Sequence, residues 1–260
     1  MAKTITFGIQ KGGSSKTTTS GIISYLLARD GYKVLAVDMD SQGNLTDLLT
    51  QKDLTFFEGK TILDAFKEDD ARKYIYNVFE NLDLLPADDF LATLSKFIYR
   101  EYERHQKKDG NFLLRETLKQ VKDEYDFIIV DTPPSLAEPM INAICASDEV
   151  VVLCESSKWA FTAIERFLET AIHAQMNYNP DLRITGILRN LIDSRRTDSK
   201  AFADLIESQY SDLVFSHLVK RKASTGRISL NGFDNNPELD AALEEYLPFY
   251  EELKQRVGIN

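Results

Sequence analysis

The fold class follows from one stretch near the N-terminus, Ile5-Thr6-Phe7-Gly8-Ile9-Gln10-Lys11-Gly12-Gly13-Ser14-Ser15-Lys16-Thr17-Thr18. Its first five residues are mostly apolar and predict a buried strand. The glycine pair predicts a tight turn, and a helical pattern over Thr17–Asp30 follows, with Gly31 as its C-terminal cap. In a strand–turn–helix unit of this kind, successive backbone N–H groups and the positive end of the helix dipole form a cradle for an anion.

The side chains of this turn predict that the anion is a nucleotide phosphate. Lys16 would reach the β- and γ-phosphates, and the hydroxyl of Thr17 would ligate Mg²⁺. A glycine-rich turn that merely caps a helix is the alternative, but Lys-Thr-Thr at the helix start disfavours it. The general pattern G-x-x-x-x-G-K-[ST] has glycine at two positions that are Gln10 and Ser15 here.

Short β-rich runs alternate with helix-length segments along the rest of the chain, which predicts a doubly wound α/β fold with a mostly parallel sheet and helices on both faces. Several runs are apolar at consecutive positions, as in strands buried on both faces. No linker or repeat interrupts the pattern, so we read residues 1–260 as one domain, with residues 51–112 as surface helices around the strand at Leu82–Pro86. The expected strands are Ile5–Ile9, Val34–Asp38, Leu82–Pro86, Phe127–Asp131, Val150–Cys154, Ile184–Leu188 and Leu213–His217, and a further helix is expected over Phe161–Asn177.

Carboxylates follow two of these strands. Asp38 and Asp40 end the second strand, and Asp131 ends the apolar run Phe127–Asp131. Loops at the carboxyl ends of parallel strands line the ligand crevice, so these side chains should lie beside the phosphate turn. Asp131 would hold Mg²⁺ through water, and the pair after the second strand suits a metal–water shell, with capping of the next helix as the alternative.

Three motifs in register resemble the ParA/MinD superfamily over nearly the whole chain. The turn is similar to that family's deviant Walker A motif K-G-G-x-G-K-T-T, in which Lys11 is the signature lysine and only Ser15 departs from the pattern. A serine at position 15 would cost roughly 1–3 kcal/mol if that position needs a positive φ. The segment from Asp38 to Asn44 resembles the switch I sequence D-x-D-x-Q-G-N, and Asp131-Thr132-Pro133-Pro134-Ser135 resembles switch II.

This resemblance implies that residues 1–260 form a single P-loop ATPase domain with ATP and Mg²⁺ as cofactors. It implies ATP contacts from residues 11–18 (Lys11, Gly12, Gly13, Ser14, Ser15, Lys16, Thr17 and Thr18) and an adenine contact from Asn190. Asp40 would orient the attacking water, and Asp38 would support the metal with Thr17 and Asp131. Lys11 would reach the nucleotide of a partner subunit, which implies an ATP-dependent homodimer with slow intrinsic turnover.

The charge distribution suggests a DNA-binding segment. The net charge is −10, with −8 in residues 1–188, +3 in residues 189–230 and −5 in residues 231–260. Asp193-Ser194-Arg195-Arg196-Thr197 resembles a family loop that contributes to non-specific DNA binding, and Lys220, Arg221 and Lys222 fall where relatives carry a second basic cluster. A solvated charged face is the alternative for any single residue. Because the first strand starts near Thr4, we expect no helix-turn-helix before it. The resemblance then implies that a ParB-like centromere-binding partner recognises the specific DNA sequence and stimulates hydrolysis.

Other members of the superfamily offer alternative functions. A MinD-like membrane ATPase would need a basic amphipathic C-terminal helix, whereas the last residues include Glu251 and Glu252. A regulatory nucleotide switch differs only in its turnover. An iron–sulfur reductase needs cysteines paired at an interface, which Cys145 and Cys154 do not suggest. We therefore expect a plasmid or chromosome partition ATPase that is cytoplasmic and nucleoid-associated, with no signal peptide and no membrane partner.

Overall fold

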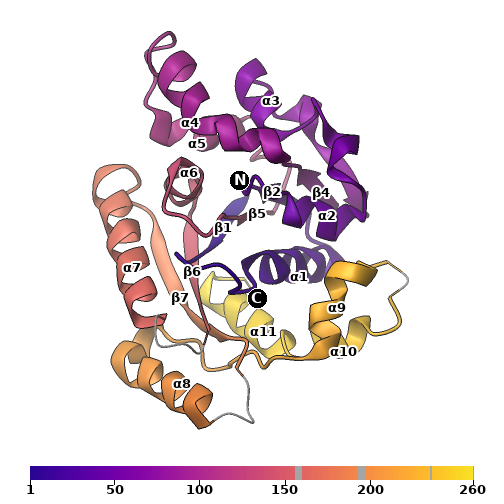
Figure 1. Ribbon diagram of the computed structural model, residues 1–260, viewed down its shortest axis with the longest axis vertical. Helices are drawn as coiled ribbons and strands as arrows, with labels where there is room; N and C mark the ends of the chain where they lie inside the picture. Colours follow the sequence, from indigo (N-terminus) through magenta and orange to yellow (C-terminus); the bar gives the residue numbers. More distant parts are fainter. Residues whose placement is uncertain (156–159, 193–196, 235, 260) are drawn as a thin grey trace.

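The computed structural model describes residues 1–155, 160–192, 197–234 and 236–259, and its centre is a β-sheet (Figure 1). Within these residues the sheet has seven strands in the order β3-β4-β2-β5-β1-β6-β7. Neighbouring strands are parallel except β3 and β4, which are antiparallel. The strands are β1 (Lys3–Gly8), β2 (Val34–Asp38), β3 (Tyr76–Phe79), β4 (Leu82–Leu85), β5 (Phe127–Asp131), β6 (Glu149–Glu155) and β7 (Arg183–Asn190).

Both faces of the sheet are buried, which explains the consecutive apolar residues of its strands. In β2, Val34 and Ala36 belong to one hydrophobic cluster, whereas Leu35 and Val37 belong to another on the opposite face. Because side chains alternate along a strand, a strand covered on both faces needs apolar residues at every position.

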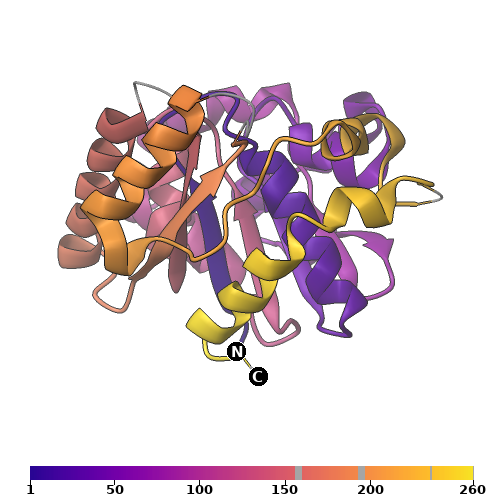
Figure 2. The same ribbon diagram turned by 90° about the horizontal axis from the view of Figure 1, so that it is seen from below.

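Helices cover both faces, as the alternating pattern predicts. In Figure 1, α3 to α7 lie on one side of the sheet, and α1, α9, α10 and α11 lie on the other. Figure 2 shows α11 alongside α1, and the Tyr250 hydroxyl of α11 donates a hydrogen bond of 2.7 Å to Asp30 after α1. The helices are α1 (Lys16–Arg29), α2 (Asn44–Thr50), α3 (Ile62–Glu68), α4 (Leu94–Phe97), α5 (Leu113–Lys119), α6 (Glu138–Ala146), α7 (Ala160–Asn177), α8 (Thr197–Tyr210), α9 (Ala223–Asn231), α10 (Leu239–Leu243) and α11 (Leu247–Arg256).

The doubly wound α/β fold is confirmed, but two strand predictions need correction. The expected strand Leu213–His217 does not form. Within this segment, Val214 makes one isolated β-bridge to Ile187. Side chains of α11 form hydrogen bonds with the backbone groups that would otherwise pair with a neighbouring strand. The Arg256 guanidinium donates to the carbonyls of Leu213 and Val214, at 3.3 and 2.7 Å, and the Glu252 carboxylate accepts the Ser216 N–H at 2.9 Å.

The seventh strand is instead β3, within residues 51–112, where the sequence predicts surface helices. This strand is short, lies at the sheet edge and has a register shift between Asn77 and Phe79, so its pattern is weak. Residues of the same segment also build the second hydrophobic cluster, including Ile62, Phe66 and Leu91. We propose that residues 1–260 form one domain, since the sheet draws strands from residue 3 to residue 190 and α11 packs on α1.

No helix among the described residues is long and apolar enough to cross a lipid bilayer.

Candidate nucleotide and magnesium site

The phosphate turn connects β1 to α1 through two left-handed residues. Gly13 has φ +75° and Ser15 has φ +58°. Ser15 is the N-terminal cap of α1, but its side chain makes no capping hydrogen bond. Left-handed backbone at these positions is what curves the chain so that the first amides of α1 point at a common centre. Position 15 therefore has the positive φ that makes a residue with a Cβ atom strained.

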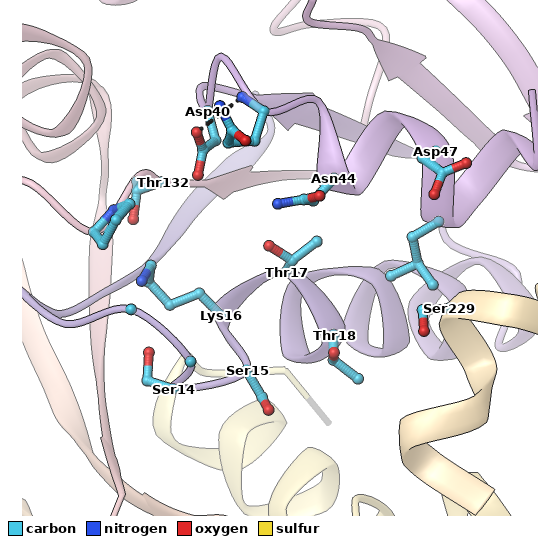
Figure 3. Close-up of a pocket in the computed structure, with 15 residues that line it drawn as sticks. Ser14, Ser15, Lys16, Thr17, Thr18, Asp40, Asn44, Asp47, Thr132 and Ser229 are labelled. Atoms are coloured by element: carbon cyan, nitrogen blue, oxygen red, sulfur yellow. Dashed lines mark hydrogen bonds between the residues drawn. The ribbon is translucent and has the colours of Figure 1, made fainter. Parts of the chain in front are cut away.

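A cavity of about 430 Å³ opens at the turn (Figure 3). In this view Asp40 and Asn44 lie across the cavity from Lys16 and Thr17, and Asp47 and Ser229 lie at its far end. We call this space the phosphate cavity. The residues that line it are Gly12, Gly13, Ser14, Ser15, Lys16, Thr17, Thr18, Asp40, Gln42, Asn44, Asp47, Leu48, Thr132, Pro134 and Ser229.

Lys16 supplies positive charge inside the turn. Its side chain is 6% exposed, and its ammonium donates a hydrogen bond of 2.8 Å to the carbonyl of Lys11. Burial lowers the pKa of Lys16, and the nearby carboxylates of Asp131 and Asp40 oppose that effect. A bound phosphate would replace the carbonyl as the partner of this ammonium and would favour its charged form.

Thr17 and Asp131 form the candidate magnesium site. The Thr17 hydroxyl donates to Asp131 Oδ2 at 2.7 Å, and the Ser20 hydroxyl donates to Oδ1 at 3.1 Å. Burial raises the pKa of Asp131 to about 6, although Thr17, Lys16 and Ser20 oppose the shift. Thr17 lines the phosphate cavity, whereas Asp131 is fully buried and is not among the described residues that line it. A hydroxyl and a carboxylate are oxygen ligands that fit Mg²⁺, which takes its remaining ligands from water and substrate phosphates, so Asp131 would act on the ion through water.

Asp38 lies beside Asp131, because β2 and β5 pair these residues in register. Burial, followed by the charge of Asp131, raises the pKa of Asp38 to about 7. Its oxygens accept hydrogen bonds from the Thr46 N–H at 2.9 Å, the Thr46 hydroxyl at 2.8 Å and the Asp40 N–H at 3.1 Å. Among the described residues, Asp38 is not part of the cavity lining. The structure thus shows it bracing the switch I loop, and its support of the metal stays a prediction. Sequence reasoning missed Thr46.

Asp40 reaches the phosphate cavity as predicted. It is 8% exposed, lines the cavity, and accepts the Gln42 N–H at 3.1 Å. This hydrogen bond leaves its second oxygen directed at the cavity (Figure 3). The carboxylate is placed where it can orient a water next to a terminal phosphate.

Asn190, predicted to contact adenine, lies next to the turn and forms hydrogen bonds with it. Its amide nitrogen donates to the Ser14 carbonyl at 3.4 Å and to the Thr19 hydroxyl at 3.2 Å, and its oxygen accepts the Leu191 N–H at 2.8 Å. Asn190 is fully buried. Its contact with adenine stays a prediction, and a rearrangement of these hydrogen bonds would have to accompany it.

A second cavity of about 490 Å³ adjoins the turn on the other side of Ser15. Lys220, Arg221 and Lys222, predicted to bind DNA, line this cavity together with Leu191. Lys222 is paired with Glu244 at 2.7 Å and Glu245 at 3.2 Å, which neutralises it, whereas Lys220 and Arg221 are exposed. The other two DNA candidates, Arg195 and Arg196, lie outside the described residues.

Lys11 points away from the phosphate cavity. Its ammonium forms an ion pair with Glu155 at the end of β6, and it lines a separate cavity with Gln10 and Arg166. Burial lowers the pKa of Lys11 despite the nearby Cys154. Sequence reasoning did not find Glu155 as its partner, because nothing in the spacing shows that β6 ends beside the turn.

Comparisons with known proteins agree with this geometry. The AAA domain family model AAA_31 matches residues 2–184. The sporulation initiation inhibitor protein Soj of Bacillus subtilis is 32% identical over 234 residues, which cover 89% of this chain and 89% of that protein.

Two solved structures share the fold and the sequence signal. A plasmid partition protein from Borrelia burgdorferi has a TM-score of 0.77 and 26% identity, covering 98% of this chain and 100% of that one. Cobyrinic acid a,c-diamide synthase from Mycobacterium smegmatis, with a bound ATP analogue and magnesium, has a TM-score of 0.77 and 29% identity, covering 88% and 91%. The chain therefore belongs to the AAA domain family and is an ATPase of the ParA/MinD superfamily, with ATP and Mg²⁺ as its cofactors.

Proposed function

We propose that this ATPase acts in plasmid or chromosome partition, as a dimer that binds DNA non-specifically in its ATP state. The observation that carries the proposal is the position of the two turn lysines. Among the described residues, the phosphate cavity is lined by Lys16 and not by Lys11, which lies on a neighbouring cavity. A lysine placed beside a phosphate site but directed out of it is suited to a nucleotide held by a second subunit. The similarity to the plasmid partition protein from Borrelia burgdorferi supports the same process.

Within one subunit the residues divide the chemistry of hydrolysis. Lys16 and the turn amides would bind the triphosphate, while Thr17 and Asp131 would hold Mg²⁺, which neutralises phosphate charge when bound. Asp40 would orient the attacking water. Lys11 of the second subunit would add positive charge to the transition state, as an arginine finger does in other phosphoryl-transfer enzymes. Turnover would therefore depend on dimerisation.

The DNA surface would combine Arg195 and Arg196 with Lys220 and Arg221. The last two are exposed at the second cavity, next to Ser15 and Thr18 of the nucleotide site. This proximity would let nucleotide binding change their arrangement. Lys222 would contribute less, because Glu244 and Glu245 already neutralise it. A ParB-like protein would stimulate hydrolysis, and the ATPase would work in the cytoplasm at the nucleoid.

DNA binding across a salt series tests the proposal. Fluorescence anisotropy with a random duplex would be measured with ATP, with ADP and without nucleotide. Binding should require ATP and weaken with salt, because a few lysine–phosphate contacts release counterions. The Lys220→Ala/Arg221→Ala variant should lose affinity, and a control variant at a distant exposed pair, Lys96→Ala/Arg100→Ala, should not. An ATP-bound dimer without DNA affinity at low salt would refute the partition role.

A further inference from the structure

The switch II loop, residues 132–137, is anchored at both ends. At its start, the Thr132 hydroxyl donates to the carbonyl of Phe7 at 2.8 Å. At its end, Glu138 opens α6 and accepts two hydrogen bonds, from the Ser95 hydroxyl at 2.8 Å and from the Tyr99 hydroxyl at 2.9 Å. Because Thr132 and Pro134 line the phosphate cavity, these anchors set the position of that cavity's wall.

The groups that hold Glu138 come from an unusual helix. Ser95 belongs to α4, and Tyr99 follows in a π-helical turn, η4 (Ile98–Tyr102). Such turns are rare and are frequent at functional sites. Tyr99 is 56% exposed, so its ring is only partly buried. The hydroxyl of Tyr99 nevertheless makes a specific side-chain hydrogen bond to Glu138.

The protonation states of Glu138 and Tyr99 favour the hydrogen bond between them. Burial acts to raise the pKa of Glu138, but hydrogen bonds from its own backbone amide, Ser95 and Tyr99 outweigh burial and lower it. The hydrogen bond to Glu138 raises the pKa of Tyr99. A protonated phenol therefore donates to an ionised carboxylate, and hydrogen bonds to charged groups are stronger than neutral ones.

The switch II loop also has room to move. A cavity of about 190 Å³ lies between residues of the switch I loop, Met39 and Ser41, and residues of the switch II segment, including Ser135 and Ala137. Ser95 lies in the lining of this cavity. If the anchor at Glu138 were released, the loop could shift into this space and carry Thr132 and Pro134 with it.

We propose that Ser95 and Tyr99 are positioning residues for ATP hydrolysis, which act by fixing Glu138 and thereby the switch II wall of the phosphate cavity. Ser95, Tyr99 and Glu138 are not among the described residues that line the phosphate cavity, so they would act without touching the nucleotide. ATP would still bind through Lys16 and the turn amides when the anchor is lost. The chemical step would slow, because the water and the terminal phosphate would no longer be held in line.

Steady-state kinetics of a Ser95→Ala/Tyr99→Phe variant test this role. The kcat should fall about tenfold, since a misplacement of about 1 Å can cost about a hundredfold. The KM for ATP, and the Kd of an ATP analogue with Mg²⁺, should stay within about twofold of the wild-type values, because the residues that bind ATP before the reaction are unchanged. Ser95→Thr, which keeps the hydroxyl, should retain wild-type kcat. Tyr76→Phe is the control for loss of a phenol hydroxyl elsewhere.

Amide hydrogen exchange gives a second measurement that a purely structural role would not reproduce. Residues 133–137 should exchange faster in the double variant, while the β1 and β5 strands stay protected. If the double variant does not fold, Tyr99→Phe alone serves, because that side chain is more than half exposed. An unchanged kcat would overturn the proposal. So would a loss of kcat with an equal loss of ATP affinity and a lower Tm.

Discussion

Replacing Ser15 by glycine should stabilise the protein without changing its affinity for ATP. Ser15 has φ 58° and ψ 33°, which is left-handed backbone, and its side chain makes no capping hydrogen bond. The Cβ atom of an L-residue is strained in this conformation, and glycine is not. Family members carry glycine at this position, so Ser15→Gly restores their backbone preference and removes no group with a role in chemistry.

The magnitude follows from two opposing terms. Relief of the left-handed strain contributes about 1–2 kcal/mol. The greater freedom of glycine in the unfolded chain costs about 0.4–1 kcal/mol. The net gain in the free energy of unfolding is therefore about 0.5–1 kcal/mol, or roughly 1–4 °C in Tm for a chain of this size. The affinity for ATP should change little, because the same backbone conformation serves the free and the bound turn.

Thermal unfolding followed by circular dichroism, together with titration of a slowly hydrolysed ATP analogue, measures both quantities. Ser15→Ala is the matched control, since it keeps the Cβ atom and removes only the hydroxyl, and its Tm should equal that of the wild type. Asn81→Gly, at another left-handed residue far along the chain, should give a smaller gain, because asparagine tolerates this conformation. A lower Tm for Ser15→Gly, or an equal gain for Ser15→Ala, would refute the strain argument.

Three further perturbations test the packing and the charges around the site. Gly8→Ala should lower the free energy of unfolding by about 1–3 kcal/mol, because the new Cβ would lie 2.5 Å from Cζ of Phe167. When Phe167→Leu is added, urea unfolding should show that part of the lost free energy of unfolding returns. Thr17→Val removes the hydroxyl that donates to Asp131, and calorimetry should show the Mg²⁺-dependent part of ATP affinity falling about tenfold or more, with little change in EDTA. The free energy of unfolding of the nucleotide-free protein should fall as pH rises from about 4 to about 7. Burial and the charge of Asp131 raise the pKa of Asp38 in the folded protein. In this pH range the folded chain therefore keeps a proton that the unfolded chain releases. Urea unfolding at several pH values should show a smaller fall in Asp38→Asn.

Local pattern was sufficient to predict the core of the fold. The strands β2 and β5 have the bounds that their apolar runs predict, Val34–Asp38 and Phe127–Asp131, because both are central and buried on both faces. Prediction was wrong where pairing depends on distant residues. The segment Leu213–His217 has strand-like composition, but Arg256 and Glu252 from α11 take its backbone hydrogen bonds. The edge strand β3 was missed because it is short and half exposed.

The site could be predicted to the level of residues but not of their contacts. Order along the chain brings Lys16, Thr17, Asp40 and Asp131 to one end of the sheet, since parallel strands end at the same edge. Side-chain partners depend on three-dimensional packing, which spacing does not encode. The brace formed by Asn190 and the pairing of Lys222 with Glu244 are therefore visible only in the structure.

Mixing two inactive variants tests whether hydrolysis combines Lys11 of one subunit with Asp40 of the other. Lys11→Ala and Asp40→Ala would each be assayed for ATP hydrolysis alone and then at equal concentrations together. If Lys11 acts on the nucleotide of the partner subunit, each variant alone should be nearly inactive. The mixture should then recover up to about a quarter of wild-type turnover, because about half of the randomly formed dimers are mixed and each holds one complete site. A mixture no more active than its components would show that Lys11 and Asp40 act within one subunit and would contradict the account.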